Sequence, residues 1–115
     1  MAGLLTDDEL HAAANLASAG LFGASVRRMQ ARGLIASVKV PRPNGGYRRA
    51  WPPECIRPCA LVAVLCRDLG MSADAASDAC KAAEWQGNNW SVQIGAVSLT
   101  GSLDDATPSS RESAA

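Results

Sequence analysis

The sequence has few aromatic residues: one Phe, one Tyr and three Trp among 115 residues. The apolar fraction is 48%, and Ala, Leu and Val supply most of it. A chain of this length is typical of one domain with a real but modest core.

A long hydrophobic run is also absent. The longest spans residues 59–66, whereas a membrane helix needs about 20 apolar residues. The N-terminal segment turns acidic at once and lacks the basic start and apolar middle of a signal peptide. The sequence therefore argues against a membrane-spanning protein and predicts a cytoplasmic location.

Only one histidine is present, His11, and we expect it to be exposed on an acidic helix. No pattern of nucleophile, base and acid is visible, and no glycine-rich loop suited to phosphate follows a strand. We therefore predict that the protein is not an enzyme and needs no cofactor.

The four cysteines are spaced C-x₃-C-x₆-C-x₁₃-C, from Cys55 through Cys59 and Cys66 to Cys80. Thiolates on one helical face can bind zinc or sense oxidation, so a metal or redox sensor is one alternative. This spacing matches no usual zinc pattern, and free cysteine is a common small core residue. We expect the cysteines to lie in the core and predict no metal site.

The formal net charge of zero conceals a strong separation of charge along the chain. Residues 1–23 carry a net charge of −3, residues 24–57 carry +7, and residues 58–115 carry −4. The alternative interpretation is a solvated basic loop. The basic residues, however, recur at spacings typical of regular secondary structure. The separation therefore indicates a polyanion-binding patch on a neutral protein.

The first helix is predicted over residues 7–17. Thr6 and Glu9 have the spacing of a capping box, and the acidic residues between and beside them suit the positive end of a helix dipole.

A second helix is predicted to begin near Gly23 and to end at Gly33, a typical residue for the position after a helix. Phe22, Val26 and Met29 recur at helical spacing and predict its buried stripe. The opposite face is predicted to be cationic, with Arg27 at its edge; its row is Ser25, Arg28 and Arg32.

A basic β-hairpin is predicted next, with strands near residues 38–40 and 47–51. The Asn-Gly-Gly turn between them supplies the positive φ angles that a hairpin tip needs. For Tyr47 and Trp51, packing beneath the hairpin is the alternative to an exposed role. Two helices followed by a basic hairpin outline a mainly α fold with a β-hairpin wing, the winged helix-turn-helix.

The second half is predicted to contain two more helices. One runs from residue 55 or 58 to 69 and is apolar almost all round, so it is either the central helix or part of a partner interface. The other is predicted over 73–86. We assign residues 1–87 to one domain, the predicted winged helix-turn-helix.

Residues 88–100 are predicted to form a short strand-like extension, because Trp90, Val92 and Ile94 alternate. A lone strand has unpaired backbone groups, so it must pair within its own domain or across a two-fold axis with a second copy. Residues 101–115 are small and polar and predict a disordered tail.

The order of these elements resembles the winged helix-turn-helix domain of MerR-type regulators. Residues 25–34 lie without a gap over that family's second helix, Thr-Leu-Arg-Tyr-Tyr-Glu-x-x-Gly-Leu. The family's wing sequence Gly-Tyr-Arg is found at Gly46-Tyr47-Arg48, and its Leu-Gly-Phe-Ser before the fourth helix appears as residues 69–72. The resemblance covers residues 5–85.

The resemblance implies a sequence-specific double-stranded DNA-binding protein that acts as a homodimer or cooperative oligomer. Transcription regulation in a phage or mobile element is the expected role. A residue matching the family's phosphate-contacting arginine is Arg27. The predicted DNA-binding residues are Ser25, Arg27, Arg28, Arg32, Lys39, Arg42, Tyr47, Arg48 and Arg49.

Departures from the family keep other interpretations open. MerR-type regulators continue into a long dimerisation helix, whereas the residues that follow the fourth predicted helix here show no heptad pattern. The same short module occurs in phage excisionases, and the stretch at residues 21–28 is similar to the small terminase subunits of lambdoid phages. An architectural DNA-binding factor is therefore one alternative. A protein-interaction module that uses the apolar helix and the Trp90 strand is another.

Overall fold

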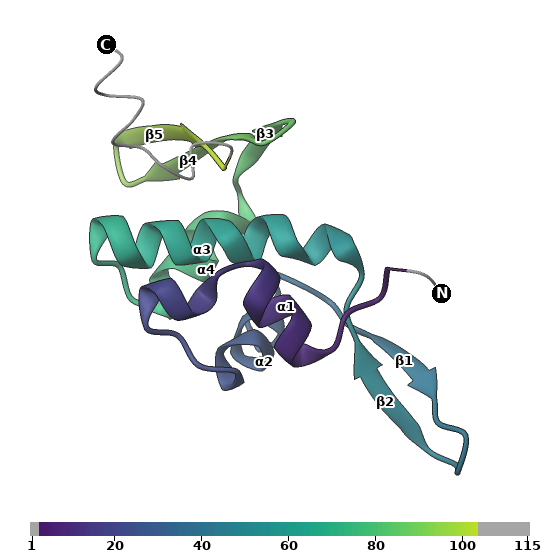
Figure 1. Ribbon diagram of the computed structural model, residues 1–115. Coiled ribbons are helices and arrows are strands. Elements are labelled where there is room, and N and C mark those ends of the chain that lie inside the picture. Colours follow the sequence, from purple (N-terminus) through teal and green to yellow (C-terminus); the bar gives the residue numbers. More distant parts are fainter. Residues whose placement is uncertain (1–2, 104–115) are drawn as a thin grey trace.

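Helix α3 runs through the middle of the protein, and the other elements lie on either side of it (Figure 1). The computed structural model describes residues 3–103. The elements are α1 (Asp7–Ala13), η1 (Leu16–Ala19), α2 (Ala24–Ala31), β1 (Val38–Pro41), β2 (Tyr47–Ala50), η2 (Pro53–Cys55), α3 (Ile56–Leu69), α4 (Ala73–Lys81), β3 (Glu84–Gln86), β4 (Asn89–Ile94) and β5 (Val97–Ser102).

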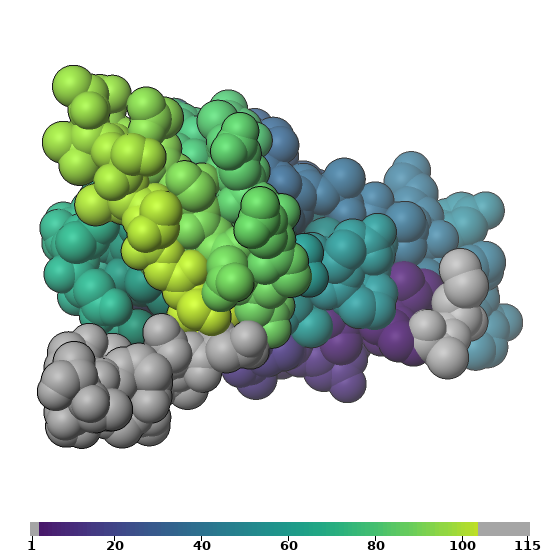
Figure 2. Space-filling model, turned by 90° about the horizontal axis from the view of Figure 1, so that it is seen from above, coloured from purple at the N-terminus to yellow at the C-terminus, as the bar shows by residue number. Residues whose placement is uncertain are grey.

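The three-stranded sheet β3–β4–β5 lies on one side of α3, and α1 and α2 lie on the other (Figure 1). The β1–β2 hairpin projects away from the sheet, and the view from above shows the sheet and the hairpin at opposite ends of the molecule (Figure 2). The described residues thus form a small α+β domain with four α-helices, one hairpin and one three-stranded sheet. Within residues 3–103, no helix has the length and apolarity needed to cross a membrane.

Helix α1 begins where the sequence predicts but ends earlier. The backbone N–H of Glu9 donates to the Thr6 hydroxyl at 3.1 Å, and the Glu9 carboxylate accepts from the Thr6 N–H at 2.8 Å, so the capping box is confirmed. The predicted end at residue 17 is wrong. Asn15 adopts a left-handed conformation with φ of 57°, which an asparagine tolerates better than most residues, and a 3₁₀ turn follows.

The buried stripe predicted for the second helix is confirmed in part in α2. Val26 and Met29 are buried, whereas Phe22 is 80% exposed, so its prediction as a buried residue is wrong. The helix begins only at Ala24, and Phe22 therefore lies outside the helical period. At the other end, Gly33 has a φ of 85°, and the N–H of Leu34 reaches the carbonyl of Met29 at 3.0 Å, as in a Schellman motif.

The hairpin forms as predicted, and its base is fastened to the N-terminal segment. Val38 pairs with Ala50 and Pro41 with Tyr47. Backbone hydrogen bonds of 2.9 and 2.8 Å join Leu5 and Trp51 in both directions. Trp51 is fully buried, whereas Tyr47 is 64% exposed, so packing beneath the hairpin holds only for the tryptophan.

Helix α3 is the central helix and contributes the largest share of the buried core. Its buried side chains are Cys59, Leu61, Val62, Ala63 and Leu65. The buried residues of the other elements, including Trp90, belong to the same cluster. Both apolar surfaces that the interaction-module alternative would use thus contribute residues to the core of the protein itself.

Helix α4 ends at Lys81, and the prediction that it extends to residue 86 is wrong. Residues 84–86 instead form β3, which pairs with β4 in an antiparallel register that places Trp85 opposite Trp90. Arg57 of α3 lies over the Trp85 ring, with its guanidinium carbon 5.2 Å from the ring centroid. For residues 84–86, pairing with β4 and the contact between Arg57 and Trp85 therefore favour a strand over the helix that the sequence pattern predicts.

The strand predicted around Trp90 pairs within its own chain, between β3 and β5. Gly101 of β5 lies against the Trp90 ring, and a Cβ atom at residue 101 would stand 2.4 Å from its Cζ2 atom. Only glycine fits there. Strand β5 runs to Ser102, so the first residues of the predicted disordered tail are ordered. The rest of that tail, residues 104–115, lies outside the described residues.

Candidate nucleic-acid interface

Seven of the eleven lysines and arginines of the sequence lie on α2, with its C-cap residue, and on the β1–β2 hairpin. Both elements are on the side of α3 away from the three-stranded sheet (Figure 1). A hydrogen bond of 2.9 Å from the Ser37 N–H to the side-chain oxygen of Gln30 ties α2 to the segment that leads into β1. The helix and the hairpin are thus held together at one side of the domain.

The exposed basic residues of this side include Arg27 of α2 and Lys39, Arg42 and Arg48 of the hairpin region. No ion pair within 4 Å involves any of the four among residues 3–103. Gly45 and Gly46 have φ angles of 95° and 75°, a conformation that favours glycine, so the hairpin tip has no side chain at these two positions. These four cations are therefore available to an anionic partner.

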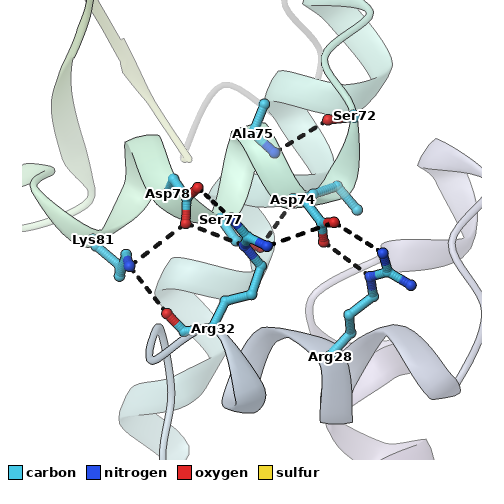
Figure 3. Close-up of polar contacts among 9 residues, drawn as sticks. Arg28, Arg32, Ser72, Asp74, Ala75, Ser77, Asp78 and Lys81 are labelled. Atoms are coloured by element: carbon cyan, nitrogen blue, oxygen red, sulfur yellow. Dashed lines mark hydrogen bonds and ion pairs between the residues drawn. The ribbon is translucent and has the colours of Figure 1, made fainter.

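Arg28 and Arg32 of α2 instead contact two carboxylates of α4 (Figure 3). The Nε and Nη2 atoms of Arg28 donate to Asp74 at 2.9 Å each. Arg32 binds both oxygens of Asp78, and its Nη1 lies 3.6 Å from Asp74. These hydrogen bonds hold the pKa of each aspartate below its usual value, because they favour the charged form.

The open face of α2 is therefore rotated from the predicted one. At about 100° per residue, the row of Ser25, Arg28 and Arg32 lies roughly a quarter turn from the buried Val26 and Met29. Helix α4 covers the edge of this row. Ser25 is half-buried and the Arg32 side chain is 38% exposed, whereas that of Arg28 is 67% exposed.

Arg27, predicted at the edge of the cationic face, is exposed and lies on the opposite side of the exposed Ala24 and Ala31 from Arg28. The sequence could not indicate this rotation, because it depends on where α4 packs.

Arg49 is the third predicted DNA-binding arginine that is already paired. Its guanidinium binds both carboxylate oxygens of Asp7 at 3.1 and 3.3 Å, and lies 6.0 Å from the Trp51 ring centroid. The indole N–H of Trp51 donates to the same carboxylate at 2.6 Å. The three residues fasten β2 to the start of α1, so Arg49 supports the hairpin. The sequence separates Asp7 from Arg49 by 42 residues, so only the fold brings them together.

The pKa of Asp7 is lowered, chiefly by its hydrogen bonds from Arg49, while partial burial acts in the opposite direction. A lowered folded-state pKa stabilises the fold above the unfolded pKa of about 4, and this stabilisation is lost as the pH falls through the folded value.

We expect Asp7→Asn to lower the free energy of unfolding by about 1 kcal/mol at pH 7, because the charged hydrogen bonds become neutral. The difference from the wild type should shrink as the pH falls below about 4 and through the lowered pKa of Asp7, because the wild-type carboxyl then also becomes neutral. Urea unfolding at pH 7 and at a series of acidic pH values measures it. A difference that grows as the pH falls would contradict an ionised Asp7 at this position.

The remaining candidate residues of the sequence lie elsewhere. His11 is half-buried, and its Nε2 donates to the carbonyl of Leu21 at 2.6 Å, so the expectation that it is simply exposed is wrong. Cys55, Cys59 and Cys80 are buried and Cys66 is half-buried, which confirms their expected place in the core.

Burial raises the pKa of Cys59 and of Cys80 to about 12, so these thiols stay protonated and unreactive near pH 7. Among residues 3–103, no group of three or more His, Cys, Asp or Glu side chains is placed to hold a metal ion. The metal-sensor and redox-sensor alternatives therefore gain no support from the cysteines.

No family model, no curated protein and no solved structure matches this chain. The resemblance to MerR-type regulators thus stays a prediction from the sequence.

Proposed function

We propose that the protein binds double-stranded DNA as a winged helix-turn-helix protein, with α2 in the major groove and the β1–β2 hairpin as the wing. The observation that carries this proposal is a set of four exposed cations on these two elements, none of which forms an ion pair with a residue in the described range 3–103. They belong to a chain with no net charge. Cations that neutralise phosphates release counterions, which favours binding.

The arrangement gives the two elements different tasks. Arg27 and the small residues Ala24 and Ala31 form the open face of α2, which is slim enough to approach base edges. In the hairpin, Arg42 and Arg48 extend towards a flanking stretch of the DNA backbone. A homodimer or cooperative oligomer would double the short site that one such module reads.

The biological role that fits best is regulation of transcription, in a phage or mobile element. An architectural role is the second candidate, and one observation favours it. Helix α4 ends at Lys81 and β3 begins at Glu84, where MerR-type regulators continue into a long dimerisation helix. A DNA-bending assay separates the two roles, because an architectural factor changes the path of the duplex on binding.

The proposal is tested by fluorescence anisotropy with a pool of random duplexes of about 25 base pairs at several salt concentrations. Four phosphate contacts predict that the logarithm of the association constant falls with the logarithm of salt with a slope of about −3.6. Absence of binding at the lowest salt concentration would refute the function. Sequencing of DNA fragments that co-purify with the protein would then identify the preferred site.

A further inference from the structure

We propose that Arg28 recognises a guanine in the major groove and that Asp74 positions its guanidinium for this task. The inference rests on the proposed function and adds to it a base and a positioning residue. It begins from the observation that Arg28 is bound to a carboxylate and yet remains largely exposed.

The contact leaves one end of the guanidinium free. Asp74 accepts one hydrogen from Nε and one from Nη2, so it covers a single edge of the planar group (Figure 3). A guanidinium carries five N–H donors, and the second Nη2 hydrogen and the nearer Nη1 hydrogen form another parallel pair. Such a pair matches the O6 and N7 acceptors of guanine.

Two hydrogen bonds of 2.9 Å also fix the plane of the guanidinium before DNA arrives. A free arginine would lose much rotamer freedom on binding, whereas a side chain already held in one orientation loses less. Asp74 itself is negatively charged and repels the phosphates, so it weakens general attraction to DNA. The pair therefore favours selectivity over affinity.

Arg32 of the same helix differs from Arg28, because its ion pairs have a structural role. Asp78 covers its Nε and Nη2 edge, and its Nη1 faces Asp74 at 3.6 Å. Its backbone carbonyl also accepts from Lys81 at 3.0 Å. With carboxylates at both ends of the guanidinium, Arg32 ties α2 to α4 and has no free donor pair to offer a base.

The test uses the tightest duplex that the wild-type protein selects from a randomised pool. Each guanine is replaced in turn by 7-deazaguanine, which lacks the N7 acceptor. We expect one replacement to weaken wild-type binding about tenfold. Asp74→Ala should bind unselected duplexes about twofold to fivefold more tightly, because a negative charge is lost, but should retain less than a twofold response to that replacement.

Two further variants separate positioning from charge and from helix packing. Asp78→Ala removes the same charge from the same helix and should keep the tenfold response. Arg28→Lys keeps the positive charge but lacks the planar fork, so it should keep affinity for unselected duplexes and lose the response. Circular dichroism melting checks that each variant is folded.

Three results would overturn the inference: a full response in folded Asp74→Ala, a full response in Arg28→Lys, or no wild-type response to any 7-deazaguanine. In each of these cases the wild type still binds duplex DNA, and the proposed function stands. A wild type that binds no duplex would refute both.

Discussion

Replacing Arg27, Arg42 and Arg48 together by alanine is expected to lower the affinity for duplex DNA by about a hundredfold or more near 0.1 M salt. Each phosphate contact contributes about 0.9 to the slope of affinity against salt, so the slope should fall by about 2.7. All three side chains are exposed, and none makes an ion pair with another described residue. The thermal stability should therefore stay near that of the wild type.

The neighbouring arginines Arg48 and Arg49 offer a matched control within one strand. Arg48→Ala should weaken DNA binding without changing stability. Arg49→Ala should lower the melting temperature, because it removes the partner of Asp7 at the base of the hairpin. Salt-dependent anisotropy and thermal melting of the two variants measure both effects. If Arg48→Ala melts early and binds normally, the assignment of the hairpin as a DNA-contacting wing is wrong.

Trp51→Ala is expected to cost about 3–5 kcal/mol of unfolding free energy, a large part of the total stability of a small domain. The ring is fully buried, and its N–H satisfies one oxygen of Asp7. Removing it leaves a cavity at the base of the hairpin, beside the start of α1. Urea unfolding followed by circular dichroism measures the loss.

Trp51→Phe separates the volume of the ring from its hydrogen bond. It fills most of the cavity but cannot donate to Asp7, so it should lose clearly less stability than the alanine variant. A loss below about 1 kcal/mol in Trp51→Ala would show that the hairpin base does not depend on this ring.

Local sequence patterns were sufficient to predict where several helices begin or end. The capping box at Thr6 and Glu9 starts α1, and glycines with positive φ follow α2 at Gly33 and α3 at Gly70. The hairpin turn was equally predictable. In each case the residues that decide the conformation are within a few positions of one another, so the sequence pattern contains the whole cause.

Interactions between residues that are far apart in the sequence were not predictable. Arg28 and Arg32 each find a carboxylate 46 residues away, on a helix whose rotation depends on the core beneath it. Residues 84–86 have a pattern compatible with helix, but they become a strand because β4 offers them a partner.

The sequence by itself determined that the domain has a basic helix followed by a basic hairpin, since charge and helical or turn patterns are properties of neighbouring residues. Only the tertiary structure decided which of these cations form ion pairs within the fold. Packing of α4 against α2 engages Arg28 and Arg32, and packing of β2 against α1 engages Arg49, while Arg27, Lys39, Arg42 and Arg48 stay exposed. The physical reason is that an ion pair forms between side chains that the fold brings within reach, whatever their separation in the chain.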